Sequence, residues 1–226
     1  MSDGLLWLLL SGILFPFILL FFVSSLVSDI GAQARILSGA ITASVILNSI
    51  YLFGQSFASQ RARGEYELYA TLPISKLIFI SGTLGTSLSL NLLSALLLFI
   101  IAILVFGFKI KITLWLIPIL ILGSLSVAGI GLLVGILSRG PGEAALITNI
   151  LVYVLSYATP IFYPIHNLPL FLQYVVLTLP TTHASALLTN ILNGTSISPI
   201  SVLVLVVWAV ALLSLTVYKL DWRLRQ

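Results

Sequence analysis

Long stretches without a charged side chain are the feature that most constrains how this chain can fold. Between residues 77 and 106, for example, no side chain is charged and most are aliphatic or aromatic. Charged residues make up only 7% of the sequence and hydrophobic residues 60%, whereas soluble domains are about a quarter charged. So few charges cannot cover the surface of a water-soluble fold. The sequence therefore predicts that lipid surrounds most of the chain.

Six apolar segments are long enough to cross a bilayer, which takes about 20 residues at about 1.5 Å of rise each. The first one lacks a basic flank and a small-residue cleavage site, so we interpret it as a retained span rather than a signal peptide. The predicted spans are residues 5–27, 36–57, 77–106, 112–137, 144–162 and 199–218. The predicted fold class is all-α: a single polytopic transmembrane domain over residues 1–226, with six transmembrane helices.

The segment between the last two spans, residues 163–198, is apolar but interrupted by Pro164, Pro169 and Pro180. It contains no Lys, Arg, Asp or Glu. This pattern predicts short helices that dip into the membrane interface. Non-helical backbone at that depth must be covered by protein or water.

Orientation follows from the distribution of Lys and Arg, which are enriched in cytoplasmic segments. With the N-terminus inside, the inner segments carry Arg61, Arg63, Lys76, Arg139, Lys219, Arg223 and Arg225, and the outer ones carry Arg35, Lys109 and Lys111. This excess predicts a multi-pass protein of the cell membrane with both termini in the cytoplasm. It also explains the net charge of +4 by topology rather than by nucleic-acid binding.

The most polar stretch is residues 58–72, which we predict to form one short amphipathic helix on the cytoplasmic surface. Ala62, Tyr66, Tyr69 and Ala70 would share one face. Ser59 would cap the start of this helix, and Pro73 would stop it. The helix is either a surface linker that turns the chain or a docking helix for a cytoplasmic partner.

Two charge pairs at i, i+4 spacing fall within this stretch, Arg61 with Glu65 and Arg63 with Glu67. Basic-before-acidic is the weaker order for such pairs, each of which contributes at most about 0.5 kcal/mol. Gly64 in the middle costs about 1 kcal/mol relative to Ala. The helix is therefore not optimised to stand alone.

The cores of the six spans contain no Asp, Glu, Lys, Arg or His. Proton-coupled carriers usually place such groups there. The strongest polar groups in the spans are Asn48, Gln55, Asn91 and Asn149. Such amides usually hold helices together, and lining a substrate path is the alternative for each of them.

The sequence also contains no Gly-x-x-x-x-Gly-Lys-Ser/Thr phosphate loop. We therefore expect no ATP site of that kind in this chain. If transport is active, a separate subunit supplies the energy, and the polar helix is a candidate contact for it.

Other chemistry is weakly indicated. There is no Cys, and the only histidines, His166 and His183, lack acidic neighbours at ligand spacing, so we expect no metal site and no catalytic residues. Gly131 and Gly135 form a Gly-x-x-x-Gly step that favours close helix approach. Packing within one subunit is the expected use of this step, and a dimer seam is the alternative.

Two motifs resemble the membrane subunits of type-2 ABC exporters. Residues 60–75 read Gln-Arg-Ala-Arg-Gly-Glu-Tyr-Glu-Leu-Tyr-Ala-Thr-Leu-Pro-Ile-Ser. This is similar to the family's Glu-Arg-x-Arg-Gly-Thr-x-Glu pattern followed by Pro-x-Ser. Residues 160–169 and 179–184 resemble the family's outer re-entrant hairpin before the last span. The order of the six spans agrees as well.

The resemblance implies roles for specific residues. The coupling helix that contacts the ATPase subunit would use Arg61, Arg63, Gly64, Glu65, Tyr66, Glu67, Leu68 and Tyr69. The outer hairpin would include Pro160, Phe162, Pro164, Asn167, Pro169, Pro180 and His183. The implied partners are an ABC ATPase subunit that binds Mg-ATP, a second identical or related permease, and the lipid bilayer.

The chain departs from the family pattern at four positions. Gln60 replaces the usual Glu, and Glu65 replaces Thr. After the hairpin the family often has an acidic residue and an Arg, where this chain has Ala186 and Thr189.

The expected function is the permease subunit of an ATP-driven exporter, which forms the path for a drug-like, lipid-like or glycan substrate. The chain itself would have no enzymatic activity and no cofactor. A stand-alone carrier or passive channel without an ATPase partner is the alternative.

Overall fold

The computed structural model describes residues 14, 17, 18, 20–25, 32–71, 73, 75–111 and 113–220. Every regular element within them is helical, which confirms the predicted all-α class. The long helices are α2 (Gln33–Ala62), α4 (Lys76–Leu104), α5 (Leu116–Leu137) and α9 (Pro199–Lys219). The shorter elements are α3 (Glu65–Thr71), α6 (Pro141–Tyr153), the π-helical turn η2 (Val154–Ala158), the 3-10 turn η3 (Ile165–Asn167), α7 (Leu170–Val176) and α8 (Pro180–Asn193).

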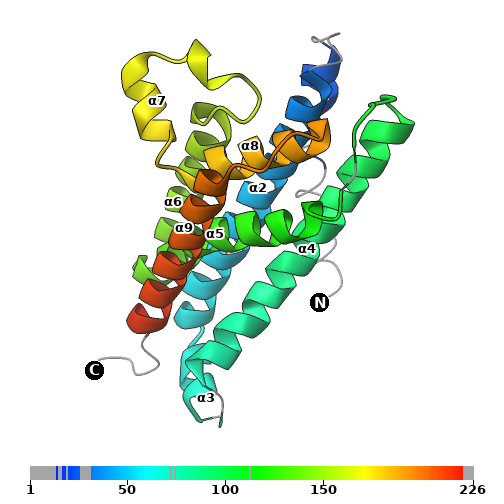
Figure 1. Cartoon of the computed structure of the whole chain (residues 1–226). Coiled ribbons are helices and arrows are strands. Elements are labelled where there is room, and N and C mark those ends of the chain that lie inside the picture. Colours follow the sequence, from blue (N-terminus) through cyan, green and yellow to red (C-terminus); the bar gives the residue numbers. More distant parts are fainter. Residues whose placement is uncertain are drawn as a thin grey trace.

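Helix α2 is the centre of the bundle and packs against α4, α5, α6 and α8 (Figure 1). Its close approach to α5 depends on two glycines. A Cβ on Gly131 would lie 2.7 Å from the carbonyl oxygen of Ser49, and one on Gly135 would lie 2.7 Å from that of Phe53. Both distances are too short for any real side chain, so only glycine fits. The predicted packing of this Gly-x-x-x-Gly step within one subunit is therefore confirmed.

Four of the described helices, α2, α4, α5 and α9, are long and apolar enough to cross a membrane. Helices α7 and α8 meet at 88° and could count as one broken span or as a re-entrant loop. The predicted first span, 5–27, lies largely outside the described residues, although residues 20–25 are helical. The described part of the chain thus has four or five candidate spans, and the count of six stays a prediction.

Helix bounds differ from the sequence-based expectation at two predicted spans. Helix α2 runs on to Ala62, past the expected end at residue 57. The span expected at 144–162 begins at Pro141, because proline suits the first position of a helix, and its helical part ends at Ala158. Thr159 is extended because it precedes Pro160, and the residue before proline avoids the helical conformation.

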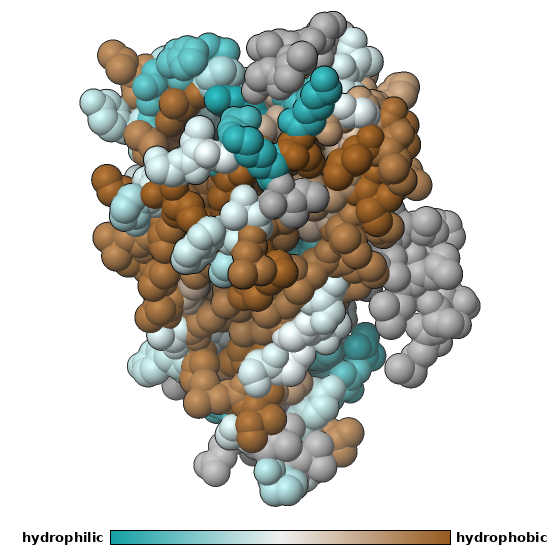
Figure 2. All heavy atoms as spheres, turned by 45° about the vertical axis from the view of Figure 1, so that its right-hand side comes forward, coloured by the Kyte–Doolittle hydropathy of each residue, from teal (hydrophilic) through white to brown (hydrophobic). Residues whose placement is uncertain are grey.

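The surface has an apolar middle and polar ends. In the view of Figure 2 the middle of the molecule is mostly brown, teal residues gather at the top, and paler residues with a teal patch lie toward the bottom. Exposed Leu and Val side chains occur on several helices, such as Leu96 on α4, Leu146 on α6 and Val207 on α9. Helix α3 lies at one end and α7 at the other (Figure 1). These are called the α3 end and the α7 end below.

Candidate functional site

The polar stretch at the α3 end is not one helix, and the predicted helix over 58–72 is corrected here. Its first five residues complete α2, so Ser59 lies inside a helix and does not cap one. The chain breaks at Arg63 and Gly64, and α3 begins at Glu65. Gly64 causes the break because its φ is +72°, a left-handed conformation that favours glycine and ends helices. Ala62 is exposed whereas Tyr66 is buried, so these two do not share a face.

An aromatic cluster attaches α3 to two of the candidate spans. We define it as Phe57 on α2, Tyr66 and Tyr69 on α3, and Phe79 on α4. Ring centroids of Phe57 and Tyr66 are 6.3 Å apart, and those of Tyr69 and Phe79 are 5.0 Å apart. Phe57 and Phe79 complete the cluster at 5.7 Å. Such pairs contribute about 0.5–1.5 kcal/mol each beyond the area they bury.

Burial dominates the electrostatics of the two tyrosines. Tyr66 is only 5% exposed, and its hydroxyl donates to the carbonyl oxygen of Phe57 at 3.4 Å. Desolvation raises the pKa of Tyr66 above the usual value, because the phenolate form would lose its hydration. The pKa of Tyr69 is raised by burial and further by the negative charge of Glu65, whose Oε2 accepts from the Tyr69 hydroxyl at 3.3 Å. Both side chains are therefore neutral structural groups at physiological pH.

The charges of this segment do not form the predicted i, i+4 pairs. The guanidinium of Arg61 donates through Nη1 to the carbonyl oxygen of Ile136 at 2.7 Å, which satisfies one of the last carbonyls of α5. Arg63 instead pairs with Glu65 at 2.6 Å, and its side chain is 61% exposed. Glu67 and Leu68 are exposed, Leu68 at 62%. The predicted contact residues thus divide into an inner set that holds α3 and an outer set, Arg63, Glu67 and Leu68, that is free to meet a partner.

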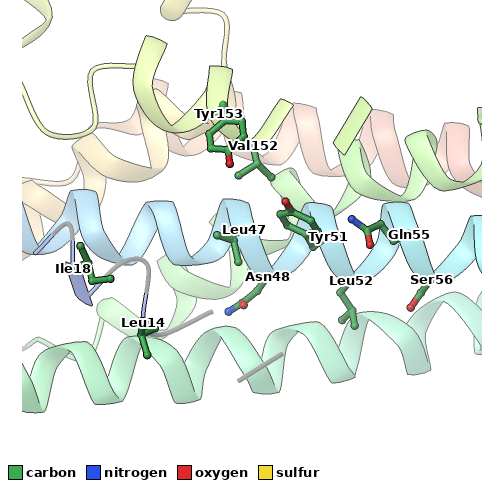
Figure 3. Close-up of a pocket in the computed structure, with 10 residues that line it drawn as sticks. All are labelled: Leu14, Ile18, Leu47, Asn48, Tyr51, Leu52, Gln55, Ser56, Val152 and Tyr153. Carbon is green, nitrogen blue, oxygen red and sulfur yellow. The ribbon is translucent and has the colours of Figure 1, made fainter. Parts of the chain in front are cut away.

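An open cavity of about 610 Å³ lies along α2, and we call it the α2 cavity (Figure 3). Its lining residues come from α2, from α6 and from the N-terminal segment: Leu47, Asn48, Tyr51, Leu52, Gln55, Ser56, Val152, Tyr153, Leu14 and Ile18. None of these described residues is an acid, a base or a histidine. The cavity therefore offers apolar surface with a few hydroxyl and amide groups, which suits an uncharged part of an amphiphile.

The amides predicted in the spans flank this cavity and also join helices. Asn48 lines the cavity and donates from Nδ2 to Ser94 Oγ on α4 at 3.2 Å. Gln55 lies about two turns further along α2 and reaches Thr148 Oγ1 on α6 at 3.5 Å. Asn149 accepts a hydrogen bond from the Tyr51 hydroxyl. The positions of these amides therefore agree with both interpretations, joining helices and lining a substrate path.

Asn91 is different, because it does not line the cavity. It is 2% exposed and donates from Nδ2 to Ser49 Oγ at 3.0 Å, between α4 and α2. Its Oδ1 has no hydrogen-bond partner among the described residues. Its position is that of a helix-joining group.

A second hollow, of about 440 Å³, continues along α2 toward the α3 end. It shares Leu52 and Ser56 with the α2 cavity, and it is bordered by Gly82 and Thr86 on α4. Gln60 also lines it, with an Oε1 atom that is buried and unpaired in the described part of the chain. The two hollows lie next to each other along α2, from Leu47 to Gln60, and we call them together the α2 groove.

The proline-interrupted segment at the α7 end divides into an exposed part, which includes α7, and a buried part, α8, that belongs to the packed bundle. Pro160 is buried, and the ring of Phe162 lies over Gly39, where a Cβ would come within 2.6 Å of it. Pro180 begins α8, which is almost wholly buried against α2, α5 and α9. Pro164 is half-buried, whereas Asn167 and Pro169 are exposed.

His183 fixes the bend between α7 and α8. It is 7% exposed, its Nε2 lies 2.8 Å from the carbonyl oxygen of Leu177, and its Nδ1 lies 3.0 Å from Ser201 Oγ on α9. A carbonyl can only accept, so Nε2 carries the hydrogen. The two contacts place His183 in a hydrogen-bonded position between α8, α9 and the chain after α7. Among the described residues no group of His, Asp or Glu is arranged to hold a metal ion.

Sequence reasoning missed Tyr51, Ser56 and Tyr153 as cavity residues. A signal was present, because Asn48, Tyr51, Gln55 and Ser56 fall at i, i+3, i+7 and i+8 and so share one helical face. Tyr51, Gln55 and Ser56 on this face are half-buried in the structure, whereas Asn48 and most of α2 are buried. A polar stripe on a hydrophobic helix was therefore a better indicator than individual amides.

The chain combines apolar helices long enough to span a membrane, an open cavity without charged lining residues, and a polar helix at one end. These features are typical of polytopic membrane transport proteins. A family model described as ABC-2 type transporter matches residues 6–193, and the chain belongs to this family. It is a permease, the non-catalytic transmembrane component of an ABC transporter, and the family implies an ATPase partner. Curated proteins gave no significant match to the chain.

Proposed function

We propose that this permease is one subunit of an ATP-driven exporter, in which α3 is the coupling helix that receives movement from a separate ATPase subunit. Mg-ATP would bind in that partner. The chain would form a single transmembrane domain over residues 1–226 with six spans, and the α3 end with both termini would face the cytoplasm. The distribution of Lys and Arg supports this orientation.

The observation that carries the proposal is the aromatic cluster. It ties α3 to α2 and to α4 at once, with Tyr66 buried between Phe57 and Phe79. A push on α3 is therefore transmitted to two helices that border the α2 groove, because packed aromatic rings resist deformation. Closure of the ATPase subunits would tilt α2 and α4 and open the groove toward the α7 end.

The docking surface would be the outer set of α3, Arg63, Glu67 and Leu68. Their exposure leaves two charges and an apolar side chain available for a partner. The groove along α2 would form half of the path, and a second identical or related permease would close it. Its uncharged lining supports a drug-like, lipid-like or glycan substrate. The segment between α6 and α9 would form the outer re-entrant hairpin.

The decisive experiment compares two substitutions of equally exposed leucines at the α3 end. Leu68 on α3 and Leu137 at the end of α5 are each 62% exposed. We expect Leu68→Glu to abolish co-purification with the ATPase subunit and substrate-dependent ATP hydrolysis, whereas Leu137→Glu retains both. Arg63→Glu should weaken docking in the same direction. Retention of coupled hydrolysis by both Leu68→Glu and Arg63→Glu would exclude α3 as the docking helix.

The stand-alone carrier or passive channel makes the opposite prediction. Reconstituted alone in liposomes, such a protein would move substrate without ATP and without a second subunit. We expect transport only when the ATPase subunit and ATP are both present.

A further inference from the structure

A pocket at the α7 end has a chemical character unlike that of the α2 cavity. It has a volume of about 270 Å³, room for about nine water molecules at about 30 Å³ each. Its walls come from the first turn of α2, from the chain around Pro160, from α8 and from the first turn of α9. Pro160, Ile165, Leu177 and Ala186 give it apolar surface, and the remaining lining groups are polar.

Among the described residues that line this pocket, Arg35 alone has a fixed charge. In the described part of the chain it has no ion-pair partner, since the ion pair found there joins Arg63 to Glu65. Arg35 is half-buried in the first turn of α2, where the helix dipole already contributes positive potential. A cation is disfavoured at such a position unless an anion lies beside it.

The hydroxyl groups around Arg35 already donate their hydrogens to other acceptors. Thr182 donates to the carbonyl oxygen of Val176 at 2.7 Å, Ser185 to that of Ile161 at 3.2 Å, and Thr189 to that of Ser185 at 2.8 Å. Because Nε2 of His183 carries the ring hydrogen, Nδ1 in the neutral ring accepts from Ser201. The oxygens of these hydroxyls remain as acceptors. The pocket therefore combines one guanidinium with a row of hydrogen-bond acceptors.

We propose that this pocket binds a phosphate-bearing group that carries its own hydrogen-bond donors, the chemistry of an ethanolamine or glycerol lipid headgroup. Arg35 holds the phosphate, since a guanidinium matches phosphate oxygens in a bidentate manner. The ammonium or hydroxyl hydrogens of the headgroup meet the acceptor oxygens of Thr182, Ser185 and Ser201. The apolar rim and the surrounding bilayer favour a lipid as the source over a soluble phosphate. The site is separate from the α2 cavity and does not depend on ATPase coupling.

The test is lipid binding by the full chain in detergent micelles, measured by native mass spectrometry. Phosphatidylethanolamine and phosphatidylglycerol should bind more tightly than phosphatidylcholine, which has the same phosphate but no donor in its headgroup. We expect Arg35→Gln to weaken their binding about tenfold or more, because a charge-assisted hydrogen bond is lost. Lys109→Gln removes an exposed cation that does not line the pocket, and it should leave binding unchanged.

A second pair of variants keeps the test independent of any effect of Arg35 on folding. Ala186 is exposed on α8 and lines the pocket. Ala186→Glu should place a carboxylate next to Arg35 and abolish lipid binding, whereas Ala186→Gln, of the same size, should retain it. Competition with phosphoethanolamine and with inorganic phosphate separates the two sources. Displacement of the lipid at equal concentration would identify a general phosphate site, and resistance to displacement would identify a lipid site.

Three results would overturn the proposal. One is equal binding by Arg35→Gln and Lys109→Gln, and another is phosphatidylcholine binding as tightly as the other two lipids. The third concerns Asp29, a carboxylate close in sequence that lies outside the described residues. If the wild type bound no lipid and Asp29→Asn did, Asp29 would be the counter-ion of Arg35 and no ligand would be needed.

Discussion

The two ends of this permease both contain a break between helices, but different forces hold the two breaks together. At the α3 end, ring contacts among Phe57, Tyr66, Tyr69 and Phe79 hold the short helix. At the α7 end, hydrogen bonds from side chains to backbone carbonyls hold the bend, as with His183 to Leu177 and Trp208 to Thr178. Ring packing occupies the inner face of α3 and leaves its outer face exposed, whereas the bonds at the α7 end fix α8 within the bundle.

This difference fits the two proposed roles. A helix that transmits movement must be stiffly joined to its spans and yet present exposed groups to a partner, as Arg63 and Leu68 do. A segment that closes the other end needs its backbone polar groups satisfied, because little water reaches them. Four changes test whether the two ends are held by separate interactions.

The largest effect should follow from removing the ring of Tyr66 from the aromatic cluster. Tyr66→Ala should cost about 3–5 kcal/mol of local stability, the range for removing a buried aromatic side chain. We expect proteolysis near Gly64 and loss of substrate-dependent ATP hydrolysis, while the thermal unfolding of the spans changes little. Tyr66→Phe, which loses only a 3.4 Å hydrogen bond, is the control and should remain active. Unchanged coupling in Tyr66→Ala would show that ring packing does not transmit movement.

At the α7 end, the corresponding change is His183→Ala. It leaves the Leu177 carbonyl and the Ser201 hydroxyl without their partner, at about 1–3 kcal/mol for each buried group. We expect a lower thermal unfolding temperature for the permease in nanodiscs but normal co-purification with the ATPase subunit. Loss of that co-purification at an unchanged unfolding temperature would show that the α7 end also affects docking of the ATPase subunit.

A smaller effect is expected for Arg61, which the family resemblance groups with the partner contacts but which the structure places against α5. Arg61→Ala should cost about 1 kcal/mol, because a partly exposed hydrogen bond to the Ile136 carbonyl is lost. Its thermal unfolding should therefore shift while affinity for the ATPase subunit stays near that of the wild type. A large drop in affinity without a shift in unfolding would assign Arg61 to the docking surface instead.

The smallest effect concerns alkaline pH. Burial raises the pKa of Tyr66 and Tyr69 above the ordinary value of 10.0, so a detached α3 would ionise its tyrosines at lower pH than the attached helix. The contribution of both groups to α3 attachment is thus fully present below about pH 10 and is lost as pH rises above it. Protease protection of α3 should fall in that range.

Two comparisons test this assignment. The double variant Tyr66→Phe with Tyr69→Phe should largely remove the loss of protection, since phenylalanine does not titrate. Hydroxyl-to-carbonyl bonds such as Thr182 to Val176 do not titrate there either, so protection of the α7 end should persist. Equal loss of protection at both ends would point to general unfolding.

Much of the architecture could be predicted from composition alone. Uncharged segments must be helical in lipid, because only a helix satisfies its own backbone hydrogen bonds there. The predicted spans 77–106 and 199–218 accordingly match α4 and α9 to within a few residues. The bounds of α6 were less predictable, since they depend on how Pro141 and Pro160 act on the backbone.

The candidate site was only partly predictable. Gly64 was visible as a weak point for a helix, but the packing of Tyr66 against Phe57 and Phe79, which attaches the helix after the break, was not. The amides Asn48 and Gln55 were identifiable as polar groups in apolar spans. Their place beside a cavity was not, since a cavity arises from the packing of α2 and α6, which are far apart in sequence.

Composition alone predicts a helical membrane protein, because so few charged side chains cannot cover a surface that faces water. The sequence also determined the family, through the Arg-x-Arg-Gly motif and the proline-rich segment. Which residues of that motif face inward and which are exposed became clear only from the three-dimensional packing. Their environment depends on helices that are distant in sequence, since Arg61 bonds to the end of α5 and Tyr66 packs against Phe79 on α4.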